Sequence, residues 1–354
     1  MFAIISIKEW WAEMLDLNGK TILITGGTGS FGHKFFEMIM NRYTPQRIII
    51  YSRDEYKQHL MKTEYQGKYD MSHVRFFIGD VRDKERLLRA FDGVDYVIHA
   101  AAMKQVPTCE YNPFEAIKTN IHGAQNVIDA AIDRKVKKVV ALSTDKAVNP
   151  INLYGGTKLV SDKLFISANA YSKISGTKFS VVRYGNVAGS RGSVIPVFEN
   201  LIANGATELP ITDKRMTRFW ISLEQGVELV FKALEESNGG ETYISKIPSF
   251  YITDLAKAML PDGGIKEIGI REGEKLHEVM VTKDDSYLTY EYENHYIIYP
   301  HFDWWNPEER SIGNGVKVEE GFEYNSGTNK QWMTVEQLQE ELKKMNARKC
   351  ERNG

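Results

Sequence analysis

The sequence predicts an α/β fold: a doubly wound parallel sheet followed by a smaller C-terminal lobe. Along the first half of the chain, short runs rich in β-branched residues alternate with amphipathic stretches. Strands that alternate with helices in this way form parallel sheets. After about Gly185 the alternation weakens, and aromatic residues gather between Tyr287 and Trp305. This change predicts a lobe that is interleaved with the sheet.

Six strands are predicted from short apolar runs bounded by turn residues. They cover residues 21–25, 47–51, 74–78, 96–100, 138–143 and 178–184. A crossover helix between the fourth and fifth strands is predicted because apolar residues recur there at helical spacing. These residues are Ile117, Ile121, Ala124, Ile128 and Ala131. Near the end of the chain, Thr334 and Gln337 form a capping-box pattern before a helix over residues 338–342.

A glycine-rich loop stands between the first predicted strand and the next helix. It reads Thr25-Gly26-Gly27-Thr28-Gly29-Ser30-Phe31-Gly32, and the helix continues through Phe35, Met38 and Ile39. This context is the one that a dinucleotide-binding fingerprint of the Rossmann type requires. The glycines allow a close approach to pyrophosphate, and the helix N-terminus offers unpaired amides. The alternative is a plain turn between strand and helix.

The end of the second strand carries basic residues where NAD-binding chains place an acidic one. The order there is Tyr51-Ser52-Arg53-Asp54, with Lys57 one turn beyond. Arg53 and Lys57 suit a 2′-phosphate, which favours NADP over NAD, although Asp54 could still accept a hydrogen bond from a ribose. After the third strand, Asp80 could accept a hydrogen bond from an adenine amino group. A helix N-cap is its compatible alternative role.

Tyr154 and Lys158 are four positions apart and therefore lie on one face of a helix. Another face of this helix could be buried through Val160, Leu164 and Ala168. A tyrosine has a pKa near ~10, so Tyr154 acts as a base at neutral pH only if that pKa falls by about three units. We expect Lys158 and an oxidised nicotinamide to lower it. A Tyr-x-x-x-Lys pair alone occurs often by chance. Here it follows a phosphate loop and the fifth strand, a context that favours a functional pair.

Asp145 and Lys146 close the fifth strand, where ligands bind in open α/β sheets. A nicotinamide oxidoreductase needs one base for the alcohol proton, so a second acid/base pair indicates redox chemistry coupled to elimination. Elimination requires a protonated Asp145 and a neutral Lys146, each about three pKa units from its usual state. For the lysine, we expect burial under a bound sugar and repulsion from Lys158 or Lys104 to supply the shift. The alternative is an ordinary loop ion pair.

Composition excludes several classes of protein. The 354 residues include 45 basic and 47 acidic side chains, a formal charge of −2, which gives no field that favours nucleic acid or an anionic membrane. Cys109, Cys350 and the eight histidines show no metal-ligand spacing, so we expect no metal site and no disulfide framework. We expect His99 to be a satisfied core residue. A reducing cytoplasm fits best, and no stretch approaches the ~20 apolar residues of a membrane-spanning helix.

From Leu15 to Leu342 the chain resembles the extended short-chain dehydrogenase/reductases. It is especially similar to the inverting UDP-N-acetylglucosamine 4,6-dehydratases that begin pseudaminic acid synthesis. Ten ordered blocks carry the resemblance: Thr25 to Gly32, Ser52-Arg53-Asp54, Gly79-Asp80-Val81-Arg82-Asp83, Ala100-Ala101-Ala102-Met103-Lys104, Ser143-Thr144-Asp145-Lys146-Ala147, Tyr154 to Lys158, Arg183-Tyr184-Gly185-Asn186, Arg191-Gly192-Ser193-Val194, Met216-Thr217-Arg218-Phe219 and Arg271-Glu272-Gly273-Glu274-Lys275-Leu276-His277-Glu278.

The resemblance implies a reaction in which Tyr154 and Lys158 support oxidation at sugar carbon 4 by tightly held NADP. Lys146 would then remove the carbon 5 proton, and Asp145 would protonate the carbon 6 hydroxyl as it leaves. Hydride returns to carbon 6 and a proton to carbon 5 from the opposite face. The product is UDP-2-acetamido-2,6-dideoxy-β-L-arabino-hex-4-ulose. Retaining dehydratases carry a glutamate in place of Lys146, and a similar group that makes capsule precursors can lack the tyrosine found here as Tyr154.

The same resemblance implies two sets of binding residues. Cofactor contacts are expected from Gly26, Thr28, Gly29, Ser30, Phe31, Gly32, Ser52, Arg53, Lys57, Asp80, Val81, Ala100, Lys104, Tyr154, Lys158 and Val187. UDP-N-acetylglucosamine contacts are expected from Lys104, Thr144, Asn186, Arg191, Gly192, Ser193, Val194, Thr212, Arg218, Arg271 and Glu274. Arginine forks suit a diphosphate, although surface solvation is the commoner fate of a single arginine.

We therefore expect four parts. Residues 1–14 form an extension, residues 15–185 an NADP-binding Rossmann domain, residues 186–342 mainly a substrate-binding lobe, and residues 343–354 a polar tail. The extension is a poor signal peptide; it either precedes a start at Met14 or forms an interfacial or partner-binding helix. The family tends to form homo-oligomers, so we expect a dimer or a hexamer. The competing functions are a UDP-sugar 4-epimerase and a non-catalytic nucleotide-sugar binding module.

Overall fold

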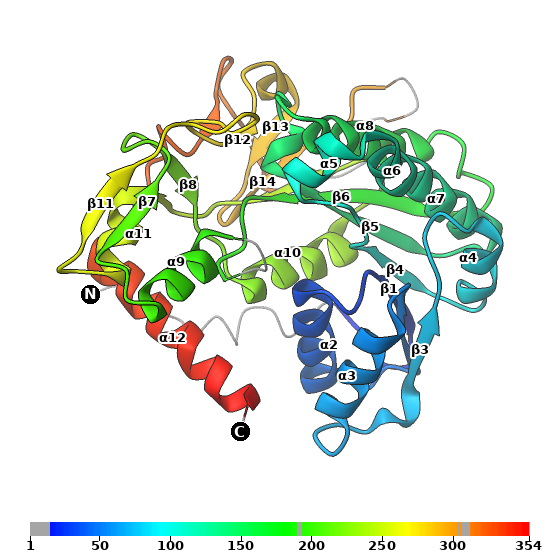
Figure 1. Cartoon of the computed structure of the whole chain (residues 1–354). Helices are drawn as coiled ribbons and strands as arrows, with labels where there is room; N and C mark the ends of the chain where they lie inside the picture. Colours follow the sequence, from blue (N-terminus) through cyan, green and yellow to red (C-terminus); the bar gives the residue numbers. More distant parts are fainter. Residues whose placement is uncertain (1–14, 190–192, 303–304, 306–311, 354) are drawn as a thin grey trace.

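The structure is a computed structural model that describes residues 15–189, 193–302, 305 and 312–353, with side chains as far as residue 347. Within this part of the chain, a ten-stranded sheet forms the centre (Figure 1). Its strand order is β15 (Val316–Lys317), β13 (Thr289–Glu291), β14 (His295–Ile298), β9 (Thr242–Ser245), β6 (Lys178–Tyr184), β5 (Lys138–Thr144), β4 (Tyr96–His99), β1 (Thr21–Thr25), β2 (Arg47–Ser52) and β3 (Val74–Ile78).

The strands from β3 to β9 in this order pair in parallel, whereas β14, β13 and β15 pair antiparallel. The order β3-β2-β1-β4-β5-β6 is that of a dinucleotide-binding doubly wound sheet. The fold class is therefore confirmed, and each of the six predicted strands ends within one residue of its predicted position. The strands that follow β6 extend this same sheet, so the C-terminal half of the chain is interleaved with it.

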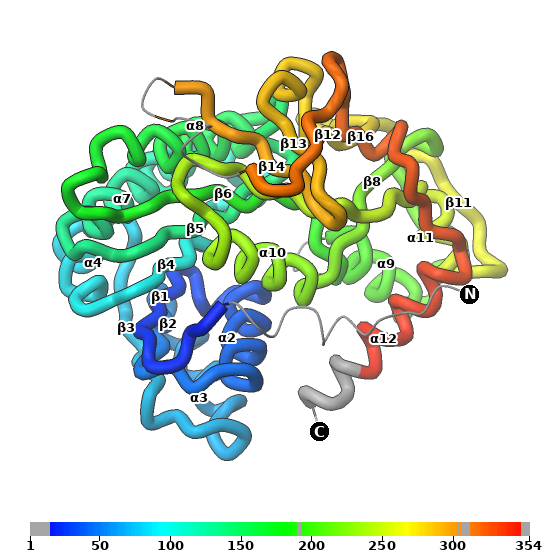
Figure 2. The backbone as a smooth tube through the Cα atoms, turned by 180° about the vertical axis from the view of Figure 1, so that it is seen from behind, coloured from blue at the N-terminus to red at the C-terminus, as the bar shows by residue number. Residues whose placement is uncertain are grey.

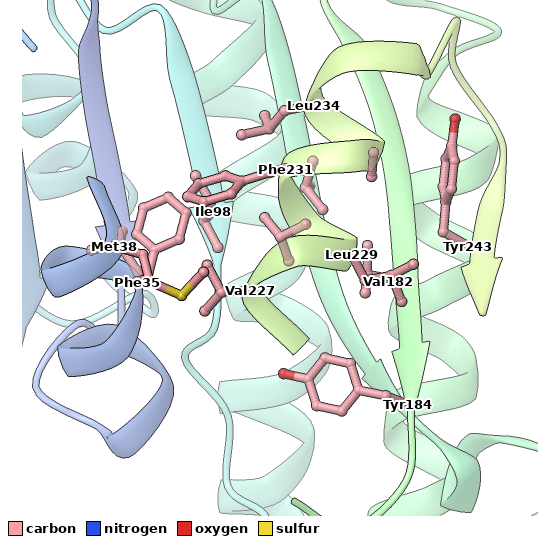
Figure 3. Close-up of a cluster of buried hydrophobic side chains, with 14 of the residues drawn as sticks. Phe35, Met38, Ile98, Val182, Tyr184, Val227, Leu229, Phe231, Leu234 and Tyr243 are labelled. Carbon is pink, nitrogen blue, oxygen red and sulfur yellow. The ribbon is translucent and has the colours of Figure 1, made fainter. Parts of the chain in front are cut away.

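Helices cover both faces of the sheet (Figure 1). One face packs on α2 (Ser30–Arg42), α3 (Glu55–Tyr65) and α10 (Leu223–Glu236), and the other on α4 (Lys84–Ala90), α7 (Gly123–Asp133) and α8 (Leu153–Ala168). Strand residues alternate between the two cores, since Ile22 and Ile24 join the first and Leu23 the second. Figure 3 shows Phe35 of α2 against Phe231 of α10, whose ring centroids are 5.7 Å apart.

The crossover helix is not one regular helix as predicted. Between α6 (Pro113–Ile117) and α7, a π-helical turn covers Lys118–His122. The wider turn rotates the buried face, so Ile117 and Ile121 are only half-buried and Asn120 is buried in their place. Asn120 donates to Met103 O at 2.9 Å and to Thr157 Oγ1 at 2.9 Å. The turn thus ties the loop after β4 to α8.

Two further helix predictions need correction. Ala168 of α8 is buried as predicted, but Val160 is 42% exposed, and Ser161 and Phe165 are buried in its place. The Thr334–Gln337 capping box forms, with Thr334 N donating to Gln337 Oε1 at 2.9 Å. The helix that follows, α12 (Val335–Asn353), continues through the predicted polar tail. It is longer than predicted because Met345, beyond Leu338 and Leu342, also packs against the third core cluster.

A smaller lobe stands beside the sheet and holds that third cluster. It contains α9 (Val194–Ala203), α11 (Ile252–Met259) and the parallel pair of β7 (Glu208–Ile211) and β11 (Gly264–Glu267). Figure 2 shows α12 along the outer side of this lobe, next to α11.

The remaining described elements are short. The pairs β8 (Thr217–Phe219) with β10 (Ser249–Tyr251), and β12 (Val279–Val281) with β16 (Tyr324–Asn325), are antiparallel, and α5 (Val106–Tyr111) precedes α6. In the described part of the chain, no helix is both long enough and apolar enough to cross a membrane.

Candidate active site

A single cavity of about 920 Å³ follows the carboxyl ends of the parallel strands and reaches the smaller lobe. Nearly all predicted site residues lie in its wall. From the predicted cofactor set the wall includes Gly26, Thr28, Gly29, Ser30, Phe31, Ser52, Arg53, Lys57, Asp80, Val81, Ala100, Lys104, Tyr154, Lys158 and Val187. From the predicted substrate and catalytic sets it includes Lys104, Thr144, Lys146, Tyr154, Asn186, Ser193, Val194, Thr212, Arg218, Arg271 and Glu274.

Four predicted residues are not in this wall. Arg191 and Gly192 lie outside the described residues. Gly32 lies behind the wall, where a Cβ would stand 2.0 Å from Gly27 O, so its role is to let α2 pack on the glycine loop. Asp145 is buried beneath the wall with 1% of its surface exposed.

The glycine loop leaves room for a ligand because its backbone is folded tightly against β4 and β2. Gly26 has φ +66°, and a Cβ on it would lie 2.9 Å from Ala101 Cα. Its N–H donates to Tyr51 O at 2.8 Å. Gly29 is the N-cap of α2 and provides no side-chain cap, so the first amides of the helix remain available to an anion in the cavity.

At the end of β2 the basic residues remain accessible while Asp54 is engaged. The Arg53 side chain is 63% exposed and its Nη1 lies 3.9 Å from Asp80 Oδ2. Asp54 caps α3, since its Oδ1 accepts from Lys57 N at 3.0 Å, and its Oδ2 lies 3.0 Å from Lys57 Nζ. Hydrogen bonds to Lys57 lower the pKa of Asp54. These contacts compete with the predicted acceptance of a ribose hydroxyl by Asp54.

Asp80 is not a helix N-cap, contrary to its predicted alternative role. Asp83 stands directly before α4 and caps it, accepting from Arg86 N at 3.0 Å. The Asp80 carboxylate instead accepts hydrogen bonds from the backbone N–H and the guanidinium group of Arg82, at donor–acceptor distances of 2.8 to 3.0 Å.

Tyr154 and Lys158 are buried on the same face of α8, as their spacing predicts. Lys158 Nζ donates to Leu142 O at 2.8 Å, and burial lowers its pKa. Burial also raises the pKa of Tyr154 to about 12, although Lys146 and a hydrogen bond with Thr144 oppose the rise. Burial therefore outweighs the groups that favour the ionised tyrosine, and the predicted lowering of the Tyr154 pKa by Lys158 together with an oxidised nicotinamide stays a prediction.

Lys146 follows β5 on a single 3₁₀ turn, η3 (Asp145–Ala147), and its ammonium is held by several acceptors. Its Nζ lies 3.1 Å from Asp145 Oδ1, 3.0 Å from Asn186 Oδ1 and 3.6 Å from Glu278 Oε1. Burial disfavours its charge, but attraction to Asp145 and Glu278 outweighs burial and raises its pKa. These contacts thus favour the protonated amine, and the predicted neutral state of Lys146 beneath a bound sugar stays a prediction.

The sequence analysis missed Glu278 as a site residue, although it ends one of the quoted blocks. Glu278 is 2% exposed and lines the cavity beside Lys146. Its Oε1 lies 3.6 Å from Arg218 Nε, while Arg218 Nη1 donates to Thr217 O at 2.7 Å and to Leu276 O at 3.3 Å. The sequence did contain a signal for Glu278, because an acidic residue stands directly before the apolar strand β12. Arg218 therefore lies at the Lys146 end of the cavity.

The segment that carries Glu278 is fixed to the start of α8. Asn152 caps α8 by accepting from Gly155 N at 2.8 Å, and its Nδ2 donates to Gly273 O at 2.9 Å. Lys275 Nζ donates to Val148 O. These contacts place the residues from Arg271 to Glu278 over the end of β5 and complete the cavity wall.

His99 is a satisfied core residue, as predicted. Its Nδ1 lies 2.9 Å from Thr25 Oγ1, and burial lowers its pKa to about 3, so the ring is neutral. Among the residues that the structure describes, no group of three or more His, Cys, Asp and Glu side chains is placed to hold a metal ion.

Comparisons with known proteins match one family model and several named relatives over most of the chain. The model of the family described as "Polysaccharide biosynthesis protein" matches residues 22–300. A Campylobacter jejuni protein named UDP-N-acetylglucosamine 4,6-dehydratase (inverting) is 58% identical over 91% of this chain and 96% of its own length. The UDP-glucose 4-epimerase of Rickettsia canadensis is 47% identical over 75% of this chain and 79% of its own length. The crystal structure of Pen from Bacillus thuringiensis matches with a TM-score of 0.84 and 38% identity, covering 94% of this chain and 99% of that one.

We expect Gly32→Ala to weaken dinucleotide binding by roughly tenfold or more, about 1.4 kcal/mol. The added Cβ would collide with Gly27 O and move the first turn of α2 away from the loop. Calorimetric titration with NADP measures the effect. Gly156→Ala is the matched control, because a Cβ there meets no atom within 4 Å. Equal NADP affinity in the Gly32→Ala variant and the unmodified protein would contradict the assigned role.

Proposed function

The chain belongs to the polysaccharide biosynthesis protein family, within the extended short-chain dehydrogenase/reductases, and we propose that it is an inverting UDP-N-acetylglucosamine 4,6-dehydratase. The observation that carries the proposal is the position of Lys146, which lines the same cavity as Tyr154 and contacts Asp145 at 3.1 Å. A dehydratase needs one base for oxidation and a separate acid/base pair for elimination. Tyr154 supplies the first, and Asp145 with Lys146 the second.

We propose NADP as the cofactor. The backbone at Gly26 leaves a cradle that a Cβ would fill, and the uncapped start of α2 suits a pyrophosphate. Arg53 and Lys57 would bind the 2′-phosphate, and the engagement of Asp54 with Lys57 favours this choice over NAD. When bound, the nicotinamide supplies the acceptor for the carbon 4 hydride and returns that hydride at carbon 6.

Tyr154 removes the proton of the carbon 4 hydroxyl in this proposal. Burial raises the pKa of Tyr154 to about 12, which is too high for a base at neutral pH, so the positive charge of an oxidised nicotinamide would have to lower it. Lys158 would hold the ribose and stabilise the ionised tyrosine from its place on the Leu142 carbonyl.

Elimination follows from the Asp145–Lys146 pair. The base must be a neutral lysine and the acid a protonated carboxyl group. Transfer of one proton from Lys146 Nζ to Asp145 Oδ1, across 3.1 Å, produces both states together and leaves the net charge of the site unchanged. A bound sugar that excludes water favours this transfer, since a low dielectric destabilises the separated charges. Lys146 then takes the carbon 5 proton, and Asp145 protonates the leaving hydroxyl.

We propose that the nucleotide sugar occupies the remainder of the cavity. Lys104 and Arg271, both exposed, would hold the diphosphate, and Arg218 would lie nearer the sugar. Thr144, Asn186, Ser193, Val194, Thr212 and Glu274 would complete the contacts, together with Arg191 and Gly192. In this proposal residues 15–185 chiefly bind the cofactor and residues 186–342 chiefly the substrate. A cytoplasmic homo-oligomer that supplies pseudaminic acid synthesis fits this role.

A UDP-sugar 4-epimerase is the second candidate, favoured by the 47% identity to the Rickettsia canadensis epimerase. Epimerisation uses the tyrosine and the cofactor but expels no hydroxyl group. The Asp145–Lys146 pair would then have no chemical role, which is why dehydration is preferred.

We expect the purified protein to convert UDP-N-acetylglucosamine in heavy water to a 4-keto-6-deoxy product with deuterium at carbon 5. The carbon 5 proton leaves to Lys146, and the proton that returns comes from exchangeable groups. NMR of the product reads both the label and the configuration. Unlabelled UDP-N-acetylgalactosamine would instead establish the epimerase, and bound NADP without turnover of any UDP-sugar would establish a binding module.

Lys146→Ala should retain NADP binding and lose dehydration by about a thousandfold or more, because it removes the base for carbon 5. Product formation and NADP affinity are measured on the same preparation. Lys173→Ala, an exposed lysine outside the cavity wall, is the control. Normal turnover by the Lys146→Ala variant would remove Lys146 as the base.

Arg53→Ala should weaken NADP binding by roughly ten- to a hundredfold and leave NAD binding nearly unchanged, because a charged hydrogen bond to the 2′-phosphate is worth about 1.5–3 kcal/mol. Titration of both nucleotides gives the ratio. Arg89→Ala, on α4 and outside the cavity wall, controls for the loss of one positive charge. Equal losses for NADP and NAD would refute the 2′-phosphate contact.

A further inference from the structure

We propose that Glu278 is a positioning residue for Lys146: with Asp145 it holds the ammonium at the cavity wall and keeps it from becoming a base until the sugar has entered. The inference deepens the proposed dehydratase function and rests on it. It assigns a role to a buried acidic residue that the reaction steps above do not use.

The geometry gives Glu278 one engaged and one unengaged oxygen. Oε1 lies 3.6 Å from Lys146 Nζ and 3.6 Å from Arg218 Nε, within ion-pair range but beyond hydrogen-bond range. Oε2 is buried and has no hydrogen-bond partner among the described residues. The side chain is 3% exposed and lines the cavity. A buried carboxylate with an unsatisfied oxygen is costly, and it persists only where surrounding charges or a ligand compensate it.

Hydrogen bonds with Ser326 fix the backbone of Glu278. The N–H of Glu278 donates to Ser326 Oγ at 2.9 Å, and its carbonyl oxygen accepts from Ser326 N at 2.8 Å. Ser326 Oγ in turn contacts Thr217 Oγ1 at 2.8 Å, next to Arg218. The two side chains that meet Glu278 therefore come from separate parts of the fold, and Glu278 joins them.

Charged and titratable groups face Lys146 from several elements. Asp145 precedes it on η3, Glu278 lies before β12, Arg218 belongs to β8, Tyr154 belongs to α8, and Lys275 comes from the segment before Glu278. Arg218 repels the ammonium and both carboxylates attract it. Asp145 is the hydrogen-bonded partner and can receive the Lys146 proton, whereas Glu278 contributes attraction without a hydrogen bond. Glu278 thus opposes the premature loss of that proton.

The removal of this charge should make Lys146 a base at lower pH. An opposite charge within about 4–6 Å shifts a pKa by about one to three units. The pair is active while it shares one proton, and dehydration is lost when that proton goes to solvent. Glu278 favours the protonated amine, so Glu278→Gln should move the falling limb of the kcat/KM profile for dehydration to lower pH by about one unit or more. Glu278→Asp keeps the charge but withdraws it by one methylene, and should move the limb in the same direction by less.

A second readout does not depend on turnover. Acetic anhydride labels neutral amines, and mass spectrometry of the NADP-loaded protein gives the pH at which Lys146 becomes half-labelled. We expect this pH to be lower in Glu278→Gln than in the unmodified protein, with Glu278→Asp between them. Glu267→Gln removes an exposed carboxylate that pairs with Lys214 at 3.9 Å, and should leave both readouts unchanged.

The inference would be overturned if Glu278→Gln changed neither the pH of half-labelling of Lys146 nor the limb of the kcat/KM profile. Movement of these two readouts to higher pH would also overturn it. If Glu278→Gln does not fold, the same result in Glu278→Asp overturns it. Failure of the proposed function is seen separately, because the unmodified protein would then give no deoxy-ketone. The labelling comparison would still decide the relation between Glu278 and Lys146.

Discussion

The parallel pairing of the strands from β3 to β9 is the constraint on which the site depends. Parallel strands present their carboxyl ends at one edge, so the glycine loop after β1, the basic pair after β2 and the Asp145–Lys146 turn after β5 open into one cavity. The segment before β12 reaches the same edge from far along the chain and brings Glu278 to Lys146. Antiparallel pairing among β1, β2 and β5 and their neighbours would place these groups at opposite edges of the sheet.

Electrostatic balance is the second constraint. Lys146, Asp145, Glu278 and Arg218 form a cluster of two positive and two negative groups, at separations of 3.1 to 3.6 Å. Buried charges are tolerated when they are paired, and the removal of one partner leaves another uncompensated. The contacts of the cluster favour the protonated state of Lys146, so the proposed reaction requires redistribution of this proton. In the proposed mechanism, substrate entry excludes water and thereby favours this redistribution.

Local patterns predicted most of the framework, and long-range contacts account for what they missed. Strands β1 to β6 and the capping box at Thr334 were predictable because a strand or a cap is encoded within a few residues. The π turn at Lys118–His122 was not, because Asn120 is buried by its contacts with Met103 and Thr157 from other segments. The hydrogen bond from Lys158 to Leu142 O and the ion pair between Glu278 and Lys146 likewise depend on tertiary packing, which the spacing of residues in the sequence does not encode.

The crystal structure of the protein with NADP and UDP-N-acetylglucosamine tests the central claim most directly. Our account predicts that the sugar ring lies between the nicotinamide and the wall formed by Tyr154 and Lys146. Lys146 Nζ should then be within roughly 3–3.5 Å of carbon 5, a distance from which a proton can be transferred. A sugar ring bound elsewhere in the cavity, with Lys146 still paired to Asp145 and Glu278 and remote from carbon 5, would contradict it.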